Sequence, residues 1–109
     1  MAVKTNLVVD QGTTYNTSID VIDDYGNLID LTGYSAAAMM RKHYASSNAT
    51  SFVTVVNVST SQVSLSLTAN TTSNLIAGRY VYDCELTDAD GKISRLVEGI
   101  VTITPQVTR

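Results

Sequence analysis

The sequence predicts an all-β fold of seven to eight short antiparallel strands in a single domain covering residues 1–109. Composition is the first reason, because Thr, Ser and Asn are abundant, whereas Lys and Glu, which usually coat exposed helices, are scarce. The second reason is the alternation of apolar and polar residues within most segments, and the third is the turn signal that follows nearly every segment. A chain of 109 residues has room for one hydrophobic core.

The first part of the chain predicts three strands. The first is expected over Lys4 to Asp10, and the second over Tyr15 to Val21, where apolar and polar residues alternate. Turn-forming residues follow at 23–27 and again at 30–33. Residues 34–42 contain Ala and Met, which favour a helix locally. We predict a strand there because strands flank it and because one of its faces gathers Ala36, Ala38 and Met40.

The middle of the chain predicts a hairpin and a crossover. After a polar connection, strands are expected over Phe52 to Val58 and Gln62 to Thr68, with a turn between them. Residues 71–75 favour one helical turn capped by a hydroxyl, and Gly78 stops it. We expect this turn to carry the chain from one sheet to the other.

The last part predicts two long strands joined by a tight turn. Arg79 to Thr87 alternates cleanly, residues 88–91 read Asp-Ala-Asp-Gly, and Lys92 to Thr104 forms the final strand. The apolar phase shifts near Gly99, so a β-bulge is predicted at this glycine. Pro105 ends the strand.

This layout is typical of an immunoglobulin-like sandwich. Tyr80 follows the bend at Gly78, so its hydroxyl is expected to turn back onto the bend as a tyrosine corner. Tyr82 stands where such a sandwich carries its second Cys, so packing has to replace the disulfide. The lone Cys84 is interpreted as a small core residue. Gly78, Tyr80, Tyr82 and Gly99 are thus the predicted structural site residues, with no catalytic, cofactor-binding or metal residue among them.

Charge and composition exclude several classes of function. A net charge of -3 gives no basic surface for a phosphate backbone, so nucleic-acid binding is not expected. Apolar segments are too interrupted for a membrane span, and the N-terminus lacks the apolar stretch of a signal peptide. One Cys and one His provide neither a disulfide nor a zinc site. No cofactor is predicted.

Few residues are candidates for chemistry. His43 is the only possible base, and we expect it on the surface, away from the buried Cys84, so no nucleophilic pair is predicted. The acidic pairs Asp23–Asp24 and Asp88–Asp90 are interpreted as turns, with a weak surface calcium site as the alternative. A sugar platform needs exposed, coplanar tyrosines, and the remaining candidates, Tyr15, Tyr25, Tyr34 and Tyr44, are scattered along the sequence.

Several apolar residues fall on outward faces in this scheme. They are Ile22, Met39, Val53, Val55, Val81 and Val97. Exposed apolar patches usually mark partner surfaces, and low charge suits close packing between copies, so a homo-oligomer is expected. The alternative is that strand phase is misread by one residue in places. The edges predicted to make contacts are the first strand and the last, Leu96 to Thr104.

The chain carries a series of turn and strand motifs in a fixed order: Gln11–Tyr15, Asp23–Asn27, Asp30–Tyr34, Arg41, Val63–Thr68, Gly78–Asp83 and Gly91–Gly99, followed by the closing segment Val101–Arg109. Their order resembles small immunoglobulin-like virion proteins of tailed bacteriophages, and the closing segment resembles those of cyanophage-type myoviruses most. The order is also similar to the N-terminal domain of the upper baseplate protein family. The resemblance spans nearly the whole chain, but its motifs are structural rather than catalytic. The chain departs from the baseplate family by lacking a C-terminal extension.

The resemblance implies a non-enzymatic structural protein of the virion, made in the host cytoplasm and assembled through contacts with other virion proteins and with its own copies. Tail, baseplate, neck and capsid-surface positions are all open. The alternative function is a glycan-binding or host-surface-binding module. An enzyme is not expected, because no nucleophile, base or metal set is present.

Overall fold

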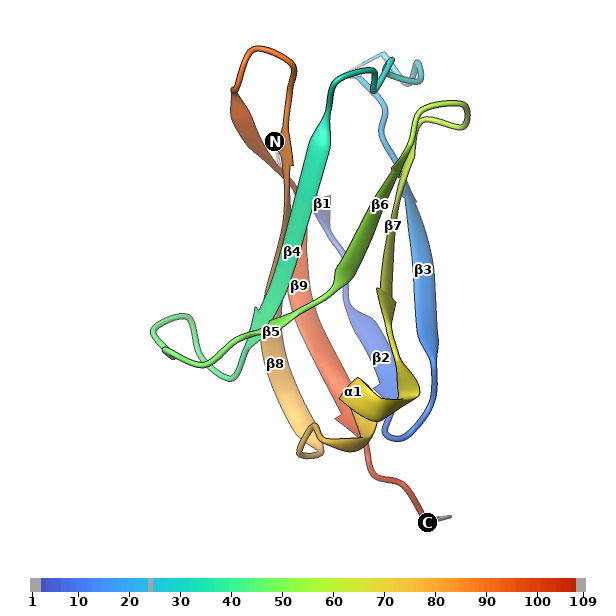
Figure 1. Cartoon of the computed structure of the whole chain (residues 1–109). Coiled ribbons are helices and arrows are strands. Elements are labelled where there is room, and N and C mark those ends of the chain that lie inside the picture. Colours follow the sequence, from blue (N-terminus) through green and yellow to red (C-terminus); the bar gives the residue numbers. More distant parts are fainter. Residues whose placement is uncertain (1–2, 24, 108–109) are drawn as a thin grey trace.

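The computed structural model describes residues 3–23 and 25–107, and it confirms the predicted all-β class. The chain forms two sheets packed face to face as an immunoglobulin-like sandwich (Figure 1). The first sheet, called sheet A, has the order β1-β9-β8-β4-β5, and β2 also pairs with β9. Sheet B has the order β3-β7-β6. The elements are β1 Val3–Lys4, β2 Leu7–Asp10, β3 Tyr15–Asp20, β4 Ser35–Arg41, β5 Thr50–Ser51, β6 Val53–Asn57, β7 Gln62–Leu67, α1 Ala69–Ser73, β8 Gly78–Thr87 and β9 Ile93–Thr104.

The core lies between the sheets, and the period-two pattern of the sequence supplies it. β7 and β8 are the clearest cases, since alternate residues of each point inward and are buried. Residues 35–41 form β4 despite their helical propensity, with Ala38 and Met40 buried and Met39 exposed as predicted. Tertiary pairing outweighs local propensity here because β4 lies between β8 and β5 and completes the hydrogen bonds of both.

The strand predicted over Phe52 to Val58 forms as β6, whereas the polar connection before it contains a short strand, β5, that belongs to the other sheet. β5 pairs with β4 in sheet A, whereas β6 pairs with β7 in sheet B. Phe52 is the pivot: its side chain is buried, and its backbone N–H donates to the Ala38 carbonyl over 3.0 Å. Two residues later, the Thr54 hydroxyl donates to the Ala36 carbonyl over 2.9 Å. The crossing segment therefore covers the edge of β4 that β5 is too short to pair.

The crossover helix begins earlier than predicted. α1 covers Ala69–Ser73, and its N-cap is Thr68, whose hydroxyl accepts from the Thr71 backbone N–H. The segment joins β7 of sheet B to β8 of sheet A, which confirms its role as a crossover. Thr72 is fully buried, and its hydroxyl donates to the Thr13 carbonyl over 2.7 Å. The helical turn is thereby tied to the β2–β3 connection at the same end of the sandwich.

The predicted bulge in β9 lies at Leu96, not at Gly99. Cys84 pairs with Val97 and Glu85 pairs with Arg95, so Leu96 is the extra residue. Gly99 pairs regularly with Tyr82, but a Cβ on it would collide with the Thr5 carbonyl oxygen. This glycine therefore permits a close backbone approach, which is the other common reason for Gly within a strand. The shifted bulge also explains why Val97, expected on the outside, is buried.

The first and last strands differ from prediction in how they pair. The first strand is split into β1 and β2 around Thr5 and Asn6, and both parts pair parallel, not antiparallel, with β9. From Val97 onward, β9 lies between these parts and β8, so it is not an edge of the sheet. The open edges are instead β1 with β2, the short β5, and the outer strands of sheet B, β3 and β6.

Candidate functional site

The predicted tyrosine corner is present. The Tyr80 hydroxyl donates to the Ile76 carbonyl over 2.7 Å, returning from β8 onto the bend that precedes it. The ammonium group of Lys42 lies 5.0 Å from the centroid of the Tyr80 ring, within the range of a cation–π contact. Gly78 has φ +140°, and a Cβ there would lie 2.9 Å from Lys42 Nζ, so the bend requires glycine.

Tyr82 links the segment between β1 and β2 to the rest of the sandwich through a hydrogen bond. Its ring is buried against Phe52, with the ring centroids 6.0 Å apart. Its hydroxyl donates to the Thr5 carbonyl over 2.6 Å. Burial, and to a smaller degree the neighbouring Tyr15 and Cys84, raise the pKa of Tyr82 to about 12, so the phenol keeps its donor proton. The contact with Thr5 was not predicted, and the only sequence signal for it is Gly99.

The structure separates the two residues considered for nucleophilic chemistry. Cys84 is fully buried between the sheets, and burial together with the nearby carboxylates raises the pKa of its thiol to about 11. His43 is exposed in the β4–β5 loop, residues 42–49. The core position predicted for Cys84 is thereby confirmed.

Asp23 and Asp88, the first member of each acidic pair, act as turn residues. Asp23 Oδ1 accepts from the backbone N–H groups of Tyr25 and Asn27, and Asp88 Oδ1 accepts from those of Asp90 and Lys92. Asp24, the second member of the first pair, lies outside the described residues. Within residues 3–23 and 25–107, no three His, Cys, Asp or Glu side chains are grouped so that they could hold a metal ion.

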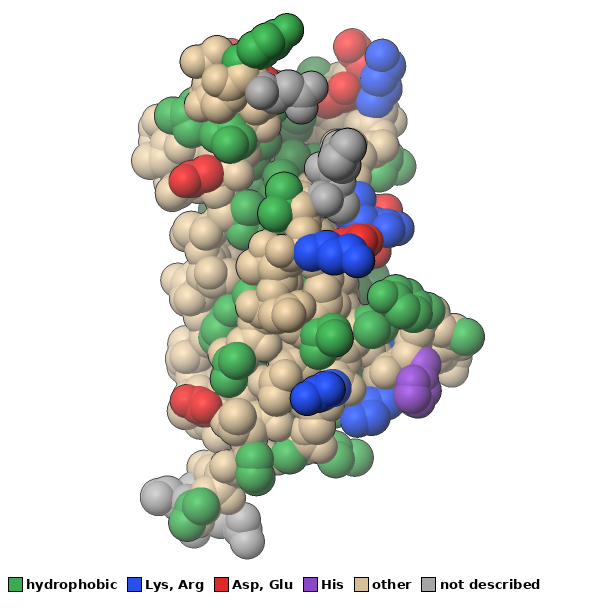
Figure 2. Space-filling view, turned by 180° about the vertical axis from the view of Figure 1, so that it is seen from behind, with side chains coloured by type: hydrophobic (Ala, Val, Ile, Leu, Met, Phe, Trp, Pro, Cys, Tyr) green, Lys and Arg blue, Asp and Glu red, His purple; other side chains and the backbone are tan. Residues whose placement is uncertain are grey.

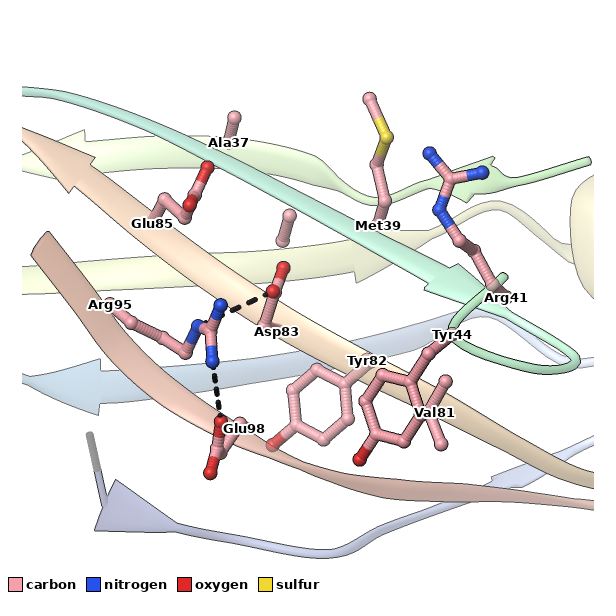
Figure 3. A pocket seen from close by; sticks show the side chains of 11 residues that line it. Ala37, Met39, Arg41, Tyr44, Val81, Tyr82, Asp83, Glu85, Arg95 and Glu98 are labelled. Atoms are coloured by element: carbon pink, nitrogen blue, oxygen red, sulfur yellow. Dashed lines mark hydrogen bonds and ion pairs between the residues drawn. The ribbon is translucent and has the colours of Figure 1, made fainter. Parts of the chain in front are cut away.

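A shallow groove of about 300 Å³ lies on the outer face of sheet A (Figure 3). Outward side chains of β4, β8 and β9 line it, together with Tyr44, which projects from the β4–β5 loop and is 88% exposed. A second hollow, of about 330 Å³, continues toward β1 and shares Tyr44 and Glu98 with the first. The loop is held in place by Arg41, whose guanidinium donates to the Ser46 carbonyl over 2.7 Å.

Arg95 is the charged centre of the groove. Its guanidinium lies 3.4 Å from Asp83 and 2.9 Å from Glu98, and the three side chains are each a third to a half exposed (Figure 3). The hydrogen bond with Glu98, and then the charge of Asp83, raise the pKa of Arg95. In a regular strand, the side chains of residues 95 and 98 would lie on opposite faces of the sheet. The bulge at Leu96 shifts the alternation by one residue, so both side chains lie on the outer face of sheet A. The sequence analysis therefore missed this ion-pair group.

The groove combines an exposed aromatic ring with hydrogen-bonding charged groups. Such a surface suits a polar ligand with one apolar face, such as a sugar ring. The described residues do not form the platform of exposed tyrosines that the sequence analysis considered for sugar binding. Tyr44 lies on the β4–β5 loop, whereas Tyr25 lies in the β3–β4 connection at the other end of the sandwich (Figure 1). Tyr34 packs on the core.

Sheet B presents a different surface. No residue from Tyr44 to Gly78 is charged, and this segment contains β5, β6, β7 and α1. The only charged residue in the three strands of sheet B is Asp20, whose carboxylate accepts from the Gln62 amide over 2.7 Å. In Figure 2 the flank formed by sheet B is mostly tan and its charged side chains are acidic, while the Lys and Arg side chains lie toward the opposite flank.

Exposed apolar side chains lie along the β6 edge of sheet B. Val53 and Val55 are each 54% exposed, as the sequence analysis predicted. Ile22 and Met39 are also exposed as predicted, whereas Val81 is half-buried within the groove. The structure thus offers two distinct candidate surfaces, the charged groove on sheet A and the face of sheet B, on which β6 and β7 carry no charge.

Comparison with known proteins adds information about the fold only. No protein-family model matches the chain, and no curated protein matches it. Among solved structures, the Listeria monocytogenes internalin-like protein lmo2027 is similar with a TM-score of 0.50 and 16% identity. The match covers 94% of this chain and 28% of that one, so this chain spans less than a third of the other's length. At this identity, the likeness supports the immunoglobulin-like sandwich and nothing further.

No helix among the described residues is long and apolar enough to cross a membrane.

Proposed function

We propose that this chain is a non-enzymatic structural component of a tailed-phage virion that acts by self-assembly and by contacts with other virion proteins. The observation that carries the self-assembly is the uncharged part of sheet B formed by β6 and β7, with valines exposed at the β6 edge. Exposed apolar side chains on an open edge favour association, and the absence of charge removes the repulsion between identical surfaces. The phage context comes from the resemblance of the turn and strand motifs, which is an analogy at the level of fold.

The first test is sedimentation velocity of the purified chain over a wide concentration range. A weight-average mass that rises with concentration supports self-assembly, whereas a strict monomer at the solubility limit contradicts it. The second test is the genomic neighbourhood of the coding sequence. Genes for head, neck or tail proteins on either side support the virion context, and a neighbourhood without any phage gene contradicts it.

Glycan binding on a host surface is the second candidate, and the groove beside Tyr44 is the observation that favours it. An exposed ring beside Arg95 and Glu98 has the donors, acceptors and apolar face that a sugar needs. A glycan array with the purified chain tests this function. Hits that disappear in Tyr44→Ala and persist in Tyr25→Ala support it, because Tyr25 is equally exposed but far from the groove. An array without hits refutes it.

A further inference from the structure

We infer that copies of this chain also associate end to end, through contact between two oppositely charged ends of the sandwich. The inference rests on the proposed self-assembly and adds a second contact, along the long axis of the molecule instead of at the β6 edge. The acidic end consists of the β3–β4 connection, the β6–β7 turn and the β8–β9 turn, residues 20–23, 25–34, 58–61 and 88–93 (Figure 1). The basic end consists of the β2–β3 connection, the β4–β5 loop and the segment from α1 into β8, residues 10–14, 41–49 and 74–80.

The two ends carry opposite charges. The described residues of the acidic end include one lysine, Lys92, and five aspartates, Asp20, Asp23, Asp30, Asp88 and Asp90. Those of the basic end include one aspartate, Asp10, and three cationic side chains, Arg41, Lys42 and Arg79. In Figure 2, acidic side chains lie at the upper end of the molecule, and basic side chains lie with the histidine toward its lower end. A second copy of this chain is therefore a partner of complementary charge.

Neither set of charges is neutralised within one molecule. Among the described residues, the ion pairs are those of Arg95, which lies between the two ends on sheet A. The Arg41 guanidinium donates to a backbone carbonyl of its own loop, and the Lys42 ammonium lies over the Tyr80 ring, so neither cation meets a carboxylate. The molecule is 43 Å long, several times the Debye length of about 8 Å in physiological salt. The charges of one end can therefore be paired only by another molecule.

Each end also exposes apolar side chains beside its charges. At the acidic end, Tyr25 is exposed at the tip of the β3–β4 connection, where Ile22 and Leu28 form an exposed cross-strand pair. At the basic end, Tyr44 and Ile76 are exposed. Apolar side chains surrounded by charged ones are typical of protein–protein contacts, so both ends have the composition of an interface.

The acidic end is already ordered in the single chain. The Val21 N–H donates to the Ser61 carbonyl over 2.9 Å, which joins the β3–β4 connection to the β6–β7 turn. Within the connection, the Asp23 N–H donates to the Asn27 carbonyl over 2.9 Å. Binding therefore costs little conformational entropy at this end.

The charges also give the contact its direction and its strength. Two acidic ends repel each other, as do two basic ends, so only a head-to-tail contact is favourable. Such a contact leaves one free end on each side of a pair, and further copies can add in a row. The molecule is 29 × 21 Å across, so an end can bury about 500 Å² on each copy, the size of a weak contact.

Sedimentation velocity at low and high salt distinguishes this contact from association through sheet B. Head-to-tail association should weaken at least about tenfold between about 50 and about 500 mM sodium chloride, because salt screens the attraction between the ends. Association through the uncharged strands β6 and β7 should not weaken. Association that does not depend on salt overturns this inference and leaves the proposed self-assembly in place, whereas a chain that stays monomeric in both salts overturns both.

Two charge-reversal variants test the direction of the contact. Asp20→Lys with Asp90→Lys changes the acidic end, and Lys42→Glu with Arg79→Glu changes the basic end; all four side chains are exposed. At low salt, each variant alone should associate at least about tenfold more weakly than the wild type. An equimolar mixture should recover association, because the first variant keeps a native basic end and the second keeps a native acidic end.

The matched control is Asn16→Lys with Ser18→Lys, which adds two lysines on β3 outside both ends. It should associate like the wild type, and circular dichroism verifies that every variant is folded. Variants that associate as strongly as the control, or a mixture that associates no better than either variant alone, overturn the inference.

Discussion

Gly99→Ala tests the close approach of the N-terminal segment to β9. Gly99 has no positive φ, so its backbone suits alanine, and the change would by itself stabilise the fold by about 0.4 to 1 kcal/mol through the unfolded chain. The Cβ, however, would overlap the Thr5 carbonyl oxygen and lie 2.9 Å from Asn6 Oδ1. Both neighbours belong to the segment between β1 and β2, so this segment has to move away from β9.

The loss in the free energy of unfolding can be calculated from the hydrogen bonds that this movement breaks. The Thr5 N–H donates to the Glu98 carbonyl over 2.8 Å, and the Thr5 carbonyl accepts from the Tyr82 hydroxyl over 2.6 Å. Asn6 Oδ1 accepts from the Ile100 N–H over 3.1 Å. At about 1 kcal/mol for each bond, the loss is about 3 kcal/mol. After the gain through the unfolded chain is subtracted, a net loss of about 2 kcal/mol remains, which lowers the melting temperature of a domain of this size by about 10 °C.

The assay is urea unfolding followed by circular dichroism, with Gly91→Ala as the control. Gly91 has φ +87° and nothing within 4 Å of an added Cβ, so this change costs only the backbone strain, about 1 kcal/mol. A Gly99→Ala protein as stable as the wild type, or no less stable than Gly91→Ala, refutes the reasoning.

A double mutant separates the steric effect from a general loss of packing. Tyr82→Phe alone removes one of the three bonds and should cost about 1 kcal/mol. In the Gly99→Ala background that bond is already lost, so adding Tyr82→Phe should cost almost nothing more. Full additivity of the two changes would show that Gly99 and Tyr82 act independently and would contradict the coupling through Thr5.

Four further predictions concern single side chains. The free energy of unfolding should fall as the pH rises from the ordinary pKa of a thiol to about 11, because the folded state holds the Cys84 proton more tightly than the unfolded state does. Urea midpoints measured across this pH range, with Cys84→Ala as the comparison, show the loss. Tyr82 adds a second loss up to about pH 12 for the same reason. Tyr80→Phe removes the bond to Ile76 and should cost about 1 kcal/mol in urea unfolding, and no change would contradict the tyrosine corner. Arg95→Ala breaks exposed ion pairs and should leave stability almost unchanged, so a clear loss by the same assay would show that the groove contributes to the fold.

Local pattern was sufficient for most of the strands and for the tight turns of this chain. The alternation along β7 and β8 identified their buried faces, because a side chain's face follows from its position in the strand alone. The Asp-Ala-Asp-Gly turn and the corner at Tyr80 were predictable because their hydrogen bonds join residues that are close in sequence. The core position of Cys84 followed from the same alternation.

The candidate surfaces were predictable only in part. The exposure of Val53 and Val55 followed from strand phase, but their place on an open edge depends on the chain leaving sheet A at Phe52. The groove was not predictable at all. Arg95 and Glu98 share a face because the bulge is at Leu96, and Tyr44 reaches that face because Arg41 holds the loop back.

The sequence by itself determined that this chain is an all-β sandwich and which residues of most strands point inward. Tertiary structure alone decided which strands are neighbours. It placed the split first strand parallel to β9, moved the bulge from Gly99 to Leu96, and left β6 as the uncharged edge. The physical reason is that the alternation of apolar and polar residues shows which face of a single strand is buried. Strand pairing depends instead on hydrogen bonds between backbone groups far apart in the sequence. Because nearly every residue carries the same backbone donor and acceptor, the sequence does not show which strands will pair.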